Sequence, residues 1–198
     1  MKLLVATSNR GKLVEIREIL GDLLELVTLG DLGLEAPEEP FVTFHENAAE
    51  KATVSARAAE LWTLGDDSGL CVDALDGAPG VHSARYAPTE AERRQKLLDA
   101  LHGVPDTDRG AHFVCAMALS APDGERLFRS EGRVEGRIVH AARGSNGFGY
   151  DPLFEPLETP GRTIAELPSA DKNRLSHRGR ALERMRPVLE KLAAGRPP

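Results

Sequence analysis

The chain has 198 residues, of which 41% are hydrophobic and 28% charged, as in a globular protein with one domain or two small lobes. Its net charge of −6 argues against a general nucleic-acid-binding surface, which is normally basic. No apolar run approaches the roughly 18 residues of a membrane-spanning helix, and the N-terminus lacks a signal-peptide pattern. Cys71 and Cys115 are too few for a disulfide framework, so we expect buried thiols in the reducing cytoplasm.

An apolar strand, a polar loop and an amphipathic helix are predicted at the N-terminus. The strand ends near Val5, and Leu13, Ile16 and Leu20 then recur at the spacing of one helix face. The loop between them, "TSNRGK" at residues 7–12, has the layout of a phosphate-binding loop. Its spacing differs from G-x-x-x-x-G-K-[ST], because the first glycine is missing and the lysine is followed by leucine.

Two interpretations of this loop are open. Unpaired backbone N–H groups at a helix start attract phosphate, and Lys12 would add a full positive charge. Alternatively, the loop is a plain turn from strand to helix, with Ser8 or Asn9 capping the helix.

Three further helices are predicted. Residues 43–62 contain no glycine or proline and many alanines, with Thr43 and Glu46 spaced as a capping box. Thr89 and Glu92 repeat this spacing before a helix that runs to about residue 101. The last helix covers about residues 176–194. Before the first of these lies a Gly- and Pro-rich loop, residues 29–40.

Adjacent carboxylates follow a strand-like run in "GDDSGL". Neighbouring residues of a strand point to opposite faces, so only one of Asp66 and Asp67 is expected to face a cleft. That carboxylate is a candidate magnesium ligand or general base, and Glu38 and Glu39 offer further oxygen ligands. A solvated acidic turn is the alternative for both pairs.

The clearest long-range signal is a hairpin. "AHFVCAMALSA" and "ERLFRSEGRVEGRI" read as strands joined by the turn "PDG". Helices and strands mix without strict alternation, so we predict an α/β fold on a mixed sheet rather than a doubly wound parallel one.

Two segments nearer the C-terminus have candidate ligand-binding residues. In "GFGYDP", glycines allow close backbone approach, and Phe148 or Tyr150 could stack on a flat ring; a core-packing loop is the alternative. "KNRLSHRGRALE" gathers basic residues about a helix start, where the dipole disfavours His177 and Arg178, so an anionic or carbonyl-rich group is expected nearby. A solvated basic helix start is the alternative.

Together these segments provide phosphate donors, metal-binding carboxylates, a stacking aromatic and polar donors for a base edge. Such a set describes a nucleoside triphosphate site. With "VATSNRGKLVEI", "TFHENAAEKA", "DDSGLCVDALDGAPGVHSARYA", "GFGYDPLF" and "SHRGRALE" in order, nearly the whole chain resembles the inosine triphosphatase family of non-standard purine nucleoside triphosphate pyrophosphatases.

The resemblance implies a single pyrophosphatase domain over residues 1–198, with an elongated mixed β-sheet, flanking helices and two lobes around a central substrate groove. It also implies a cytoplasmic homodimer that uses Mg²⁺ and hydrolyses ITP, dITP and XTP to the monophosphate and pyrophosphate. No nucleic acid or membrane partner is expected.

The resemblance also implies roles for particular residues. Asp67 would be the catalytic base, and Glu39 and Asp67 would bind the metal. The substrate-binding residues would be Thr7, Ser8, Asn9, Arg10, Gly11, Lys12, Lys51, Ser68, Phe148, Gly149, Tyr150, Asp151, Lys172, His177 and Arg178.

The chain departs from the family pattern at two places. It has "EEPFVTF", with Phe41 near a position where glycine is frequent, which leaves open whether Glu38 or Glu39 is the metal ligand; we favour Glu39. Ser8 also stands where glycine is common. Rival functions are a nucleotide-binding module without chemistry, a P-loop NTPase, and a pyrophosphatase for modified pyrimidine triphosphates.

Overall fold

The computed structural model describes residues 1–196. Its strands are β1 (Lys2–Ala6), β2 (Glu25–Thr28), β3 (Thr63–Val72), β4 (Gly110–Ser120), β5 (Leu127–Ile138) and β6 (Phe154–Pro156). Its α-helices are α1 (Arg10–Leu20), α2 (Phe44–Ala59), α3 (Glu90–Ala100), α4 (Ser169–Leu175) and α5 (His177–Ala193). Short 3-10 helices occupy Gly21–Leu23, Gly30–Leu32, Asp73–Leu75, Gly80–Arg85, Asp106–Asp108, Asp151–Leu153 and Ile164–Glu166.

The strands form one mixed sheet in the order β2-β1-β3-β4-β5-β6. β1 pairs in parallel with both β2 and β3, whereas β5 and β6 are antiparallel. The predicted hairpin is confirmed: β4 and β5 are neighbours, and the turn between them is closed by a bond from the Gly124 amide to the Ala121 carbonyl. The predicted α/β fold on a mixed sheet is therefore confirmed.

The chain divides into two compact units. Unit 1 contains residues 1–67, 115–132 and 177–198, and unit 2 contains residues 68–114 and 133–176. β3, β4 and β5 each contribute residues to both units. Within the described residues 1–196, no helix is long and apolar enough to cross a membrane.

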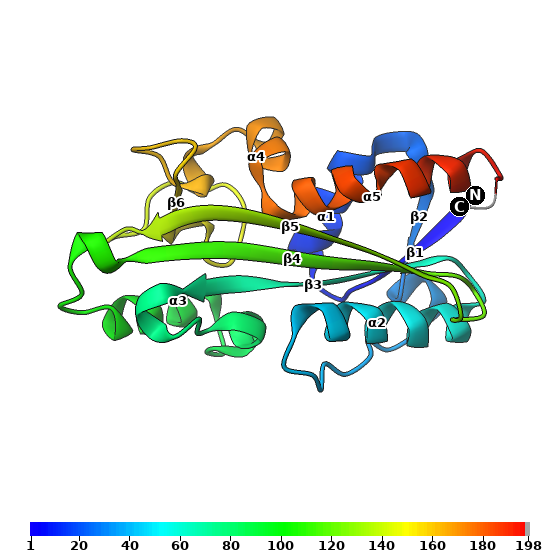
Figure 1. The fold of residues 1–198 in the computed structure, drawn as a ribbon, viewed down its shortest axis with the longest axis horizontal. Helices are drawn as coiled ribbons and strands as arrows, with labels where there is room; N and C mark the ends of the chain where they lie inside the picture. Colours follow the sequence, from blue (N-terminus) through cyan, green and yellow to red (C-terminus); the bar gives the residue numbers. More distant parts are fainter. Residues whose placement is uncertain (197–198) are drawn as a thin grey trace. The chain divides into compact units, whose positions relative to one another are not determined.

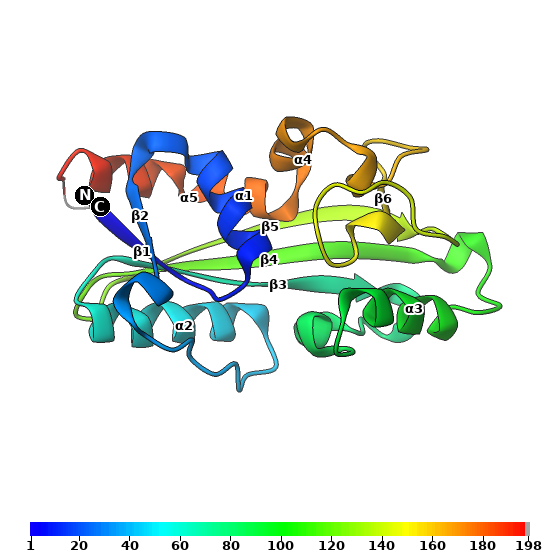
Figure 2. The ribbon, with the colours of Figure 1, turned by 180° about the vertical axis from the view of Figure 1, so that it is seen from behind.

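In unit 1, helices cover both faces of the strands. Figures 1 and 2 show α2 on one face and α1 with α5 on the other. In the layer of α1 and α5, apolar side chains at helical spacing face the sheet. Burying one aliphatic side chain completely contributes about 1.5–3 kcal/mol to the stability of the fold. On α5, four side chains at helical spacing are buried, namely Leu182, Met185, Leu189 and Leu192. On the opposite face, small side chains from α2 and β4 make a thin layer, Ala48, Ala52, Ala116 and Ala118.

Unit 2 has its own hydrophobic core. α3 lies on one side of the strands of this unit and α4 on the other (Figures 1 and 2), while β6 pairs with β5 at the edge of the sheet. The core includes Leu97 and Leu101 at the end of α3 and an edge-to-face aromatic pair, Phe113 and Phe154, with ring centroids 4.8 Å apart.

The predicted helix starts are confirmed by their caps. Thr43 accepts a hydrogen bond from the Glu46 amide at the start of α2. Thr89 and Glu92 form a complete capping box at the start of α3. Four elements differ from expectation: "GDDSGL" lies inside the single strand β3 instead of following a strand, and β2, β6 and α4 were not foreseen.

Candidate active site

The site in unit 1 depends on a close contact between β3 and α2. A Cβ added at Gly65 would lie 2.2 Å from the Ala48 carbonyl oxygen and 2.8 Å from the Ala52 amide nitrogen. Any other residue at this position would therefore push the helix off the strand. Because side chains alternate along a strand, Asp67 shares the Gly65 face and points toward the same helix.

Asp67 is held by two side chains from successive turns of α2. Its Oδ1 lies 3.1 Å from Lys51 Nζ, and its Oδ2 accepts a hydrogen bond of 3.1 Å from Asn47 Nδ2. Lys51 Nζ also lies 2.7 Å from Glu39 Oε1. The ammonium group of Lys51 thus joins the two carboxylates predicted as metal ligands. Glu38 is exposed, and Glu39 is the member of its pair that reaches this cluster.

Burial sets the charge properties of the cluster. Burial raises the pKa of Asp67, Lys51 and Lys12 lower it, and the nearby Glu39 raises it again, so that overall the pKa lies above the ordinary aspartate value. For Lys51, burial alone would lower the pKa, but Asp67 and Glu39 reverse this and raise it. Lys51 therefore stays charged, and Asp67 is a more basic carboxylate than one in water.

Asp66 points to the opposite face of β3 and is completely buried, with 0% of its surface exposed. Its Oδ1 lies 2.6 Å from Lys12 Nζ, and its Oδ2 lies 2.8 Å from Arg178 Nε and 3.3 Å from Cys115 Sγ. Arg178 also forms an ion pair with Glu15. We call Asp66, Lys12, Arg178 and Glu15 the buried ion cluster.

The buried ion cluster explains why a positive charge, that of Arg178, is tolerated at the start of a helix. Arg178 lies in the first turn of α5 with 1% of its surface exposed, and the carboxylates of Asp66 and Glu15 are the anionic groups expected there. Burial alone would raise the pKa of Asp66, but Arg178 and Lys12 hold it well below the ordinary value. A Cβ on Gly132 would lie 1.9 Å from the His177 carbonyl oxygen, so only glycine lets α5 begin here.

The N-terminal loop is capped by Asn9, one of the two caps considered. Asn9 Oδ1 accepts a 3.1 Å bond from the Lys12 amide, and the Asn9 amide donates to Thr7 Oγ1 at 3.2 Å. Ser8 and Arg10 have exposed side chains on either side of the cap. The structure thus confirms a strand-to-helix turn. The side chain of Lys12, at the end of this loop, reaches Asp66. Phosphate binding by residues 7–12 stays a prediction.

In unit 2, the glycine-rich segment is organised by a buried ion pair. Lys172 Nζ lies 2.6 Å from Asp151 Oδ2, which also accepts a 3.0 Å bond from the Phe148 amide. Lys172 Nζ lies 5.1 Å from the centroid of the Phe148 ring, within the range of a cation–π contact. Gly147 has φ of +78°, and a Cβ there would lie 2.1 Å from Asp151 Oδ2. The predicted residues Phe148, Asp151 and Lys172 are therefore brought together.

The two aromatic side chains of this segment differ in their surroundings. Tyr150 is buried in the core of unit 2, and its hydroxyl donates a 3.1 Å bond to the Ser83 carbonyl. Burial raises the pKa of Tyr150. Phe148 is only half-buried, so of the two rings it is the candidate for stacking. The Gly149 carbonyl accepts a 2.8 Å bond from Arg94, and Ser68 follows Asp67 on β3 as a half-buried residue.

Sequence reasoning missed several residues that organise the site. Asn47 stands four residues before Lys51, the spacing that places two side chains on one helix face. Glu15 stands three residues after Lys12 and shares a helix face in the same way. These spacings were visible in the sequence. The contact of Cys115 with Asp66 had no local signal.

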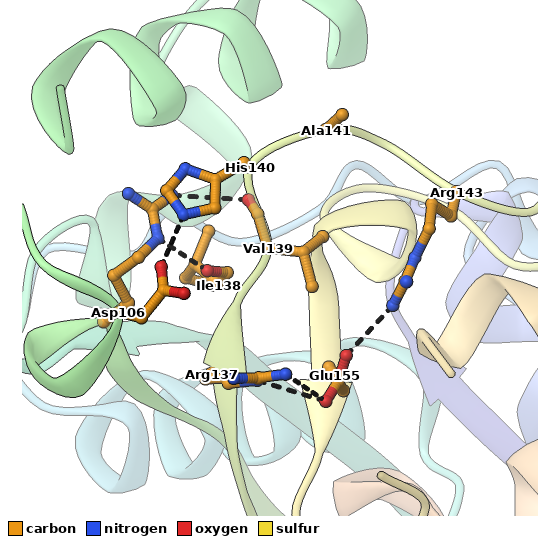
Figure 3. Close-up of a pocket in the computed structure, with 9 residues that line it drawn as sticks. Asp106, Arg137, Ile138, Val139, His140, Ala141, Arg143 and Glu155 are labelled. Atoms are coloured by element: carbon orange, nitrogen blue, oxygen red, sulfur yellow. Dashed lines mark hydrogen bonds and ion pairs between the residues drawn. The ribbon is translucent and has the colours of Figure 1, made fainter. Parts of the chain in front are cut away.

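A separate cavity of about 310 Å³ lies in unit 2, and no predicted site residue lines it. Figure 3 shows Arg137 and Arg143 directed at Glu155, and His140 beside Asp106. Glu155 Oε1 lies 2.8 Å from Arg137 Nη2, and its Oε2 lies 3.0 Å from Arg143 Nη2. Arg137, Arg143 and Glu155 are therefore paired with one another, as are His140 and Asp106, while the Arg109 guanidinium donates to backbone carbonyls.

Comparison with known proteins places the chain in a family. A sequence model of the Ham1 family matches residues 3–188. The chain belongs to the Ham1 family. The family resemblance drawn from the sequence motifs is thereby confirmed.

Relatives and solved structures in the Ham1 family cover nearly the whole chain. It is 46% identical to a dITP/XTP pyrophosphatase of Synechocystis sp. over 183 residues, 92% of each chain. A Ham1 protein from Coxiella burnetii superposes with a TM-score of 0.85 at 42% identity, covering 96% of this chain and 99% of its own. A nucleoside-triphosphatase, dITP/XTP pyrophosphatase, from Mycobacterium abscessus has a TM-score of 0.74 at 44% identity, covering 94% and 100%.

Proposed function

We propose that this protein is a nucleoside triphosphate pyrophosphatase that hydrolyses non-standard purine nucleoside triphosphates (ITP, dITP and XTP) to the monophosphate and pyrophosphate. Relatives that are 42–48% identical over most of the chain have the name dITP/XTP pyrophosphatase. The observation that carries the chemistry is the position of Lys51 Nζ, 3.1 Å from Asp67 and 2.7 Å from Glu39. This contact brings three groups together in unit 1. Asp67 is the candidate base and one of the two oxygen ligands, Glu39 is the other ligand, and Lys51 is the phosphate-binding cation.

Glu39 and Asp67 fit a divalent cation, and we propose Mg²⁺. Magnesium is usually bound by one or two protein carboxylates together with substrate phosphates and water. No group of three or more His, Cys, Asp or Glu side chains suited to a metal occurs in residues 1–196, which agrees with a site that the substrate completes. When bound, the ion supplies charge neutralisation on the polyphosphate and Lewis-acid activation.

Asp67 is the proposed general base. Its carboxylate would accept a proton from the water that attacks the α-phosphorus, the α–β phosphoanhydride bond would break, and pyrophosphate would leave. Burial raises the pKa of Asp67, and the higher pKa makes its carboxylate a better proton acceptor. A well-placed base contributes roughly 100-fold or more to the rate. The bonds from Asn47 and Lys51 fix the carboxylate in one orientation.

The polyphosphate is assigned to unit 1. Lys12 and Lys51 would balance its charge, and the loop from Thr7 to Gly11 would add backbone N–H groups at the start of α1. Lys12 Nζ is held by Asp66 rather than by either of the proposed metal ligands. It can therefore keep its position when a metal ion binds Glu39 and Asp67.

The nucleoside is assigned to Phe148, to the main chain of the segment Gly149–Asp151, and to Ser68 and Lys172. Phe148 would stack on the purine, a contact worth about 1–3 kcal/mol per base. His177 and Arg178 would donate to the carbonyl at purine position 6, which adenine lacks. The buried ion cluster holds Arg178 in a fixed orientation for this.

We further propose that both units act together as one pyrophosphatase domain, in a homodimer in the cytoplasm. The free thiols of Cys71 and Cys115 agree with a reducing compartment. Sedimentation of the purified protein tests the dimer, because a monomeric mass at micromolar concentration contradicts it.

The deciding experiment is a substrate panel of ITP, dITP, XTP, ATP, GTP and dUTP with Mg²⁺. Pyrophosphate is detected colorimetrically, and chromatography identifies the nucleotide product. We expect pyrophosphate and monophosphate from ITP, dITP and XTP, with much slower turnover of ATP. Release of orthophosphate and a diphosphate points to a different hydrolase, preference for a pyrimidine contradicts the purine assignment, and binding without turnover indicates a regulatory module.

A further inference from the structure

Asn47 occupies a position between the two halves of the proposed metal site. It lies on α2 with 0% of its surface exposed, and its side-chain amide makes contacts in two directions. Toward β3, Nδ2 donates to Asp67 Oδ2 at 3.1 Å. Toward the preceding loop, the same Nδ2 donates to the Phe41 carbonyl at 3.1 Å, and Oδ1 accepts from the Phe41 amide at 3.0 Å.

The contact with Phe41 matters because the loop before α2 contains Glu39, a proposed metal ligand. Phe41 lies two residues after Glu39. The amide and the carbonyl of Phe41 both form hydrogen bonds with the Asn47 side chain. Asn47 therefore fixes the main chain of the loop at two atoms. Without regular secondary structure at residues 34–40, the loop relies on such contacts for its position.

We infer that Asn47 is a positioning residue that sets Asp67 and the Glu39 loop in a fixed relation to each other. This inference rests on the proposed function for its catalytic part. A carboxylate shifted by about 1 Å from its productive position can lower a rate by roughly 100-fold. Asn47 acts through Asp67 and Phe41 and is given no contact with substrate.

Two substitutions separate the contacts. Asn47→Ala removes both, so we expect a fall in kcat of roughly 100-fold and clearly faster hydrogen exchange at the Phe41 amide. Asn47→Asp keeps an oxygen that can accept from the Phe41 amide but replaces Nδ2, the donor to both Asp67 and the Phe41 carbonyl, by a second acceptor. We expect slow exchange at Phe41 to persist in Asn47→Asp while kcat falls steeply.

Ser55 provides the matched control. It lies on the same helix with 2% of its surface exposed, and its hydroxyl has no hydrogen-bond partner in the structure. Ser55→Ala should leave both kcat and Phe41 exchange within about twofold of wild type, because it removes a buried polar group without breaking a contact. Thermal melts identify any variant whose loss reflects unfolding.

The test combines exchange and kinetics. Slow exchange of the Phe41 amide in the wild-type protein is required, and fast exchange there overturns the inference without any variant. Full kcat in a folded Asn47→Ala protein overturns the catalytic part. In an Asp67→Asn background, Asn47→Ala should change the residual rate less than about twofold, because the two act together. If wild type releases no pyrophosphate from any nucleotide, the proposed function fails, and the exchange measurements still decide whether Asn47 holds the loop.

Discussion

Asp66 and Asp67 are adjacent on β3, yet their carboxylates bind cations on opposite faces of the strand. Asp67 lies 3.1 Å from Lys51 on α2, whereas Asp66 lies 2.6 Å from Lys12 on α1. The pKa of Asp67 is raised and that of Asp66 is well below the ordinary value. Two adjacent residues therefore supply a basic carboxylate on the α2 side of β3 and, on the α1 and α5 side, an ionised carboxylate that balances the charges of Lys12 and Arg178.

Asp67→Asn should abolish most turnover and leave the fold intact. The amide keeps the shape of the side chain but removes the charge and the basic oxygen, so we expect a loss of at least about 100-fold in kcat. Pyrophosphate release at saturating ITP and Mg²⁺ measures it, alongside a thermal melt. Activity within about threefold of wild type, in protein with an unchanged melt, would mean that the base lies elsewhere.

Asp66→Asn should mainly destabilise the protein. It leaves the fully buried Arg178 with less compensating charge, and breaking a buried ion pair costs about 3–5 kcal/mol. Urea unfolding followed by circular dichroism measures the change. The control is Glu183→Gln, which breaks an exposed ion pair with Arg186 and should cost less than about 1 kcal/mol. Equal effects of the two substitutions would contradict the structural role of Asp66.

Lys12→Ala and Lys51→Ala should weaken the triphosphate more than the monophosphate product. Both ammonium groups are assigned to the phosphate tail, which the product largely lacks. Calorimetric titration with a non-hydrolysable ITP analogue and with IMP compares the two ligands. Lys2→Ala is the control, since Lys2 is an exposed residue that pairs with Glu25 away from these carboxylates. Equal losses for both ligands would move the lysines away from the polyphosphate.

Phe148→Ala and Tyr150→Phe should have different effects, although the residues are two apart. Loss of the half-buried Phe148 ring should raise KM for ITP by roughly tenfold through lost stacking. Loss of the Tyr150 hydroxyl removes its bond to Ser83 and should cost about 1 kcal/mol of stability with KM unchanged. Steady-state kinetics and urea unfolding on both variants make the comparison. A raised KM in Tyr150→Phe would contradict its assignment to the core.

Glu155 should make stability depend on acid pH. Burial alone would raise its pKa, but a bond from the Gly161 backbone and the pairing with Arg137 and Arg143 lower it overall. A lowered folded-state pKa gives stability that is present above the unfolded value, about 4.3, and is lost as pH falls through the folded value. The Tm difference between wild type and Glu155→Gln should therefore shrink below about pH 4. A difference that is constant from neutral to acid pH contradicts this.

Local patterns were sufficient to predict much of the fold. Helix starts at Thr43 and Thr89 follow from capping residues a few positions apart, and the β4–β5 hairpin follows from two strand-like runs about a turn. The continuous β3 did not follow, because its glycines disfavour a strand locally. Its place in the sheet between β1 and β4 outweighs that preference.

The candidate site was predicted as a set of residue types, and its internal connections were not. Lys51, Glu39 and Asp67 were assigned together by family resemblance, and the structure brings them into contact. The bond from Arg178 to Asp66 joins residues 112 positions apart, so no local pattern contains it. Tyr150 and Phe148 looked equivalent in sequence because burial separates them only once the core of unit 2 has formed.

The direct backbone contact at Gly65 has a consequence for engineering. Because β3 meets the main chain of α2 there, two backbones in direct contact set the distance between the strand that carries Asp67 and the helix whose side chains hold its carboxylate. On the proposed function, selectivity for the base can therefore be redesigned at Phe148 without altering this contact. The same contact constrains Gly65 itself: even alanine there would force β3 from α2 and move the carboxylate of Asp67, the proposed base, away from its partners.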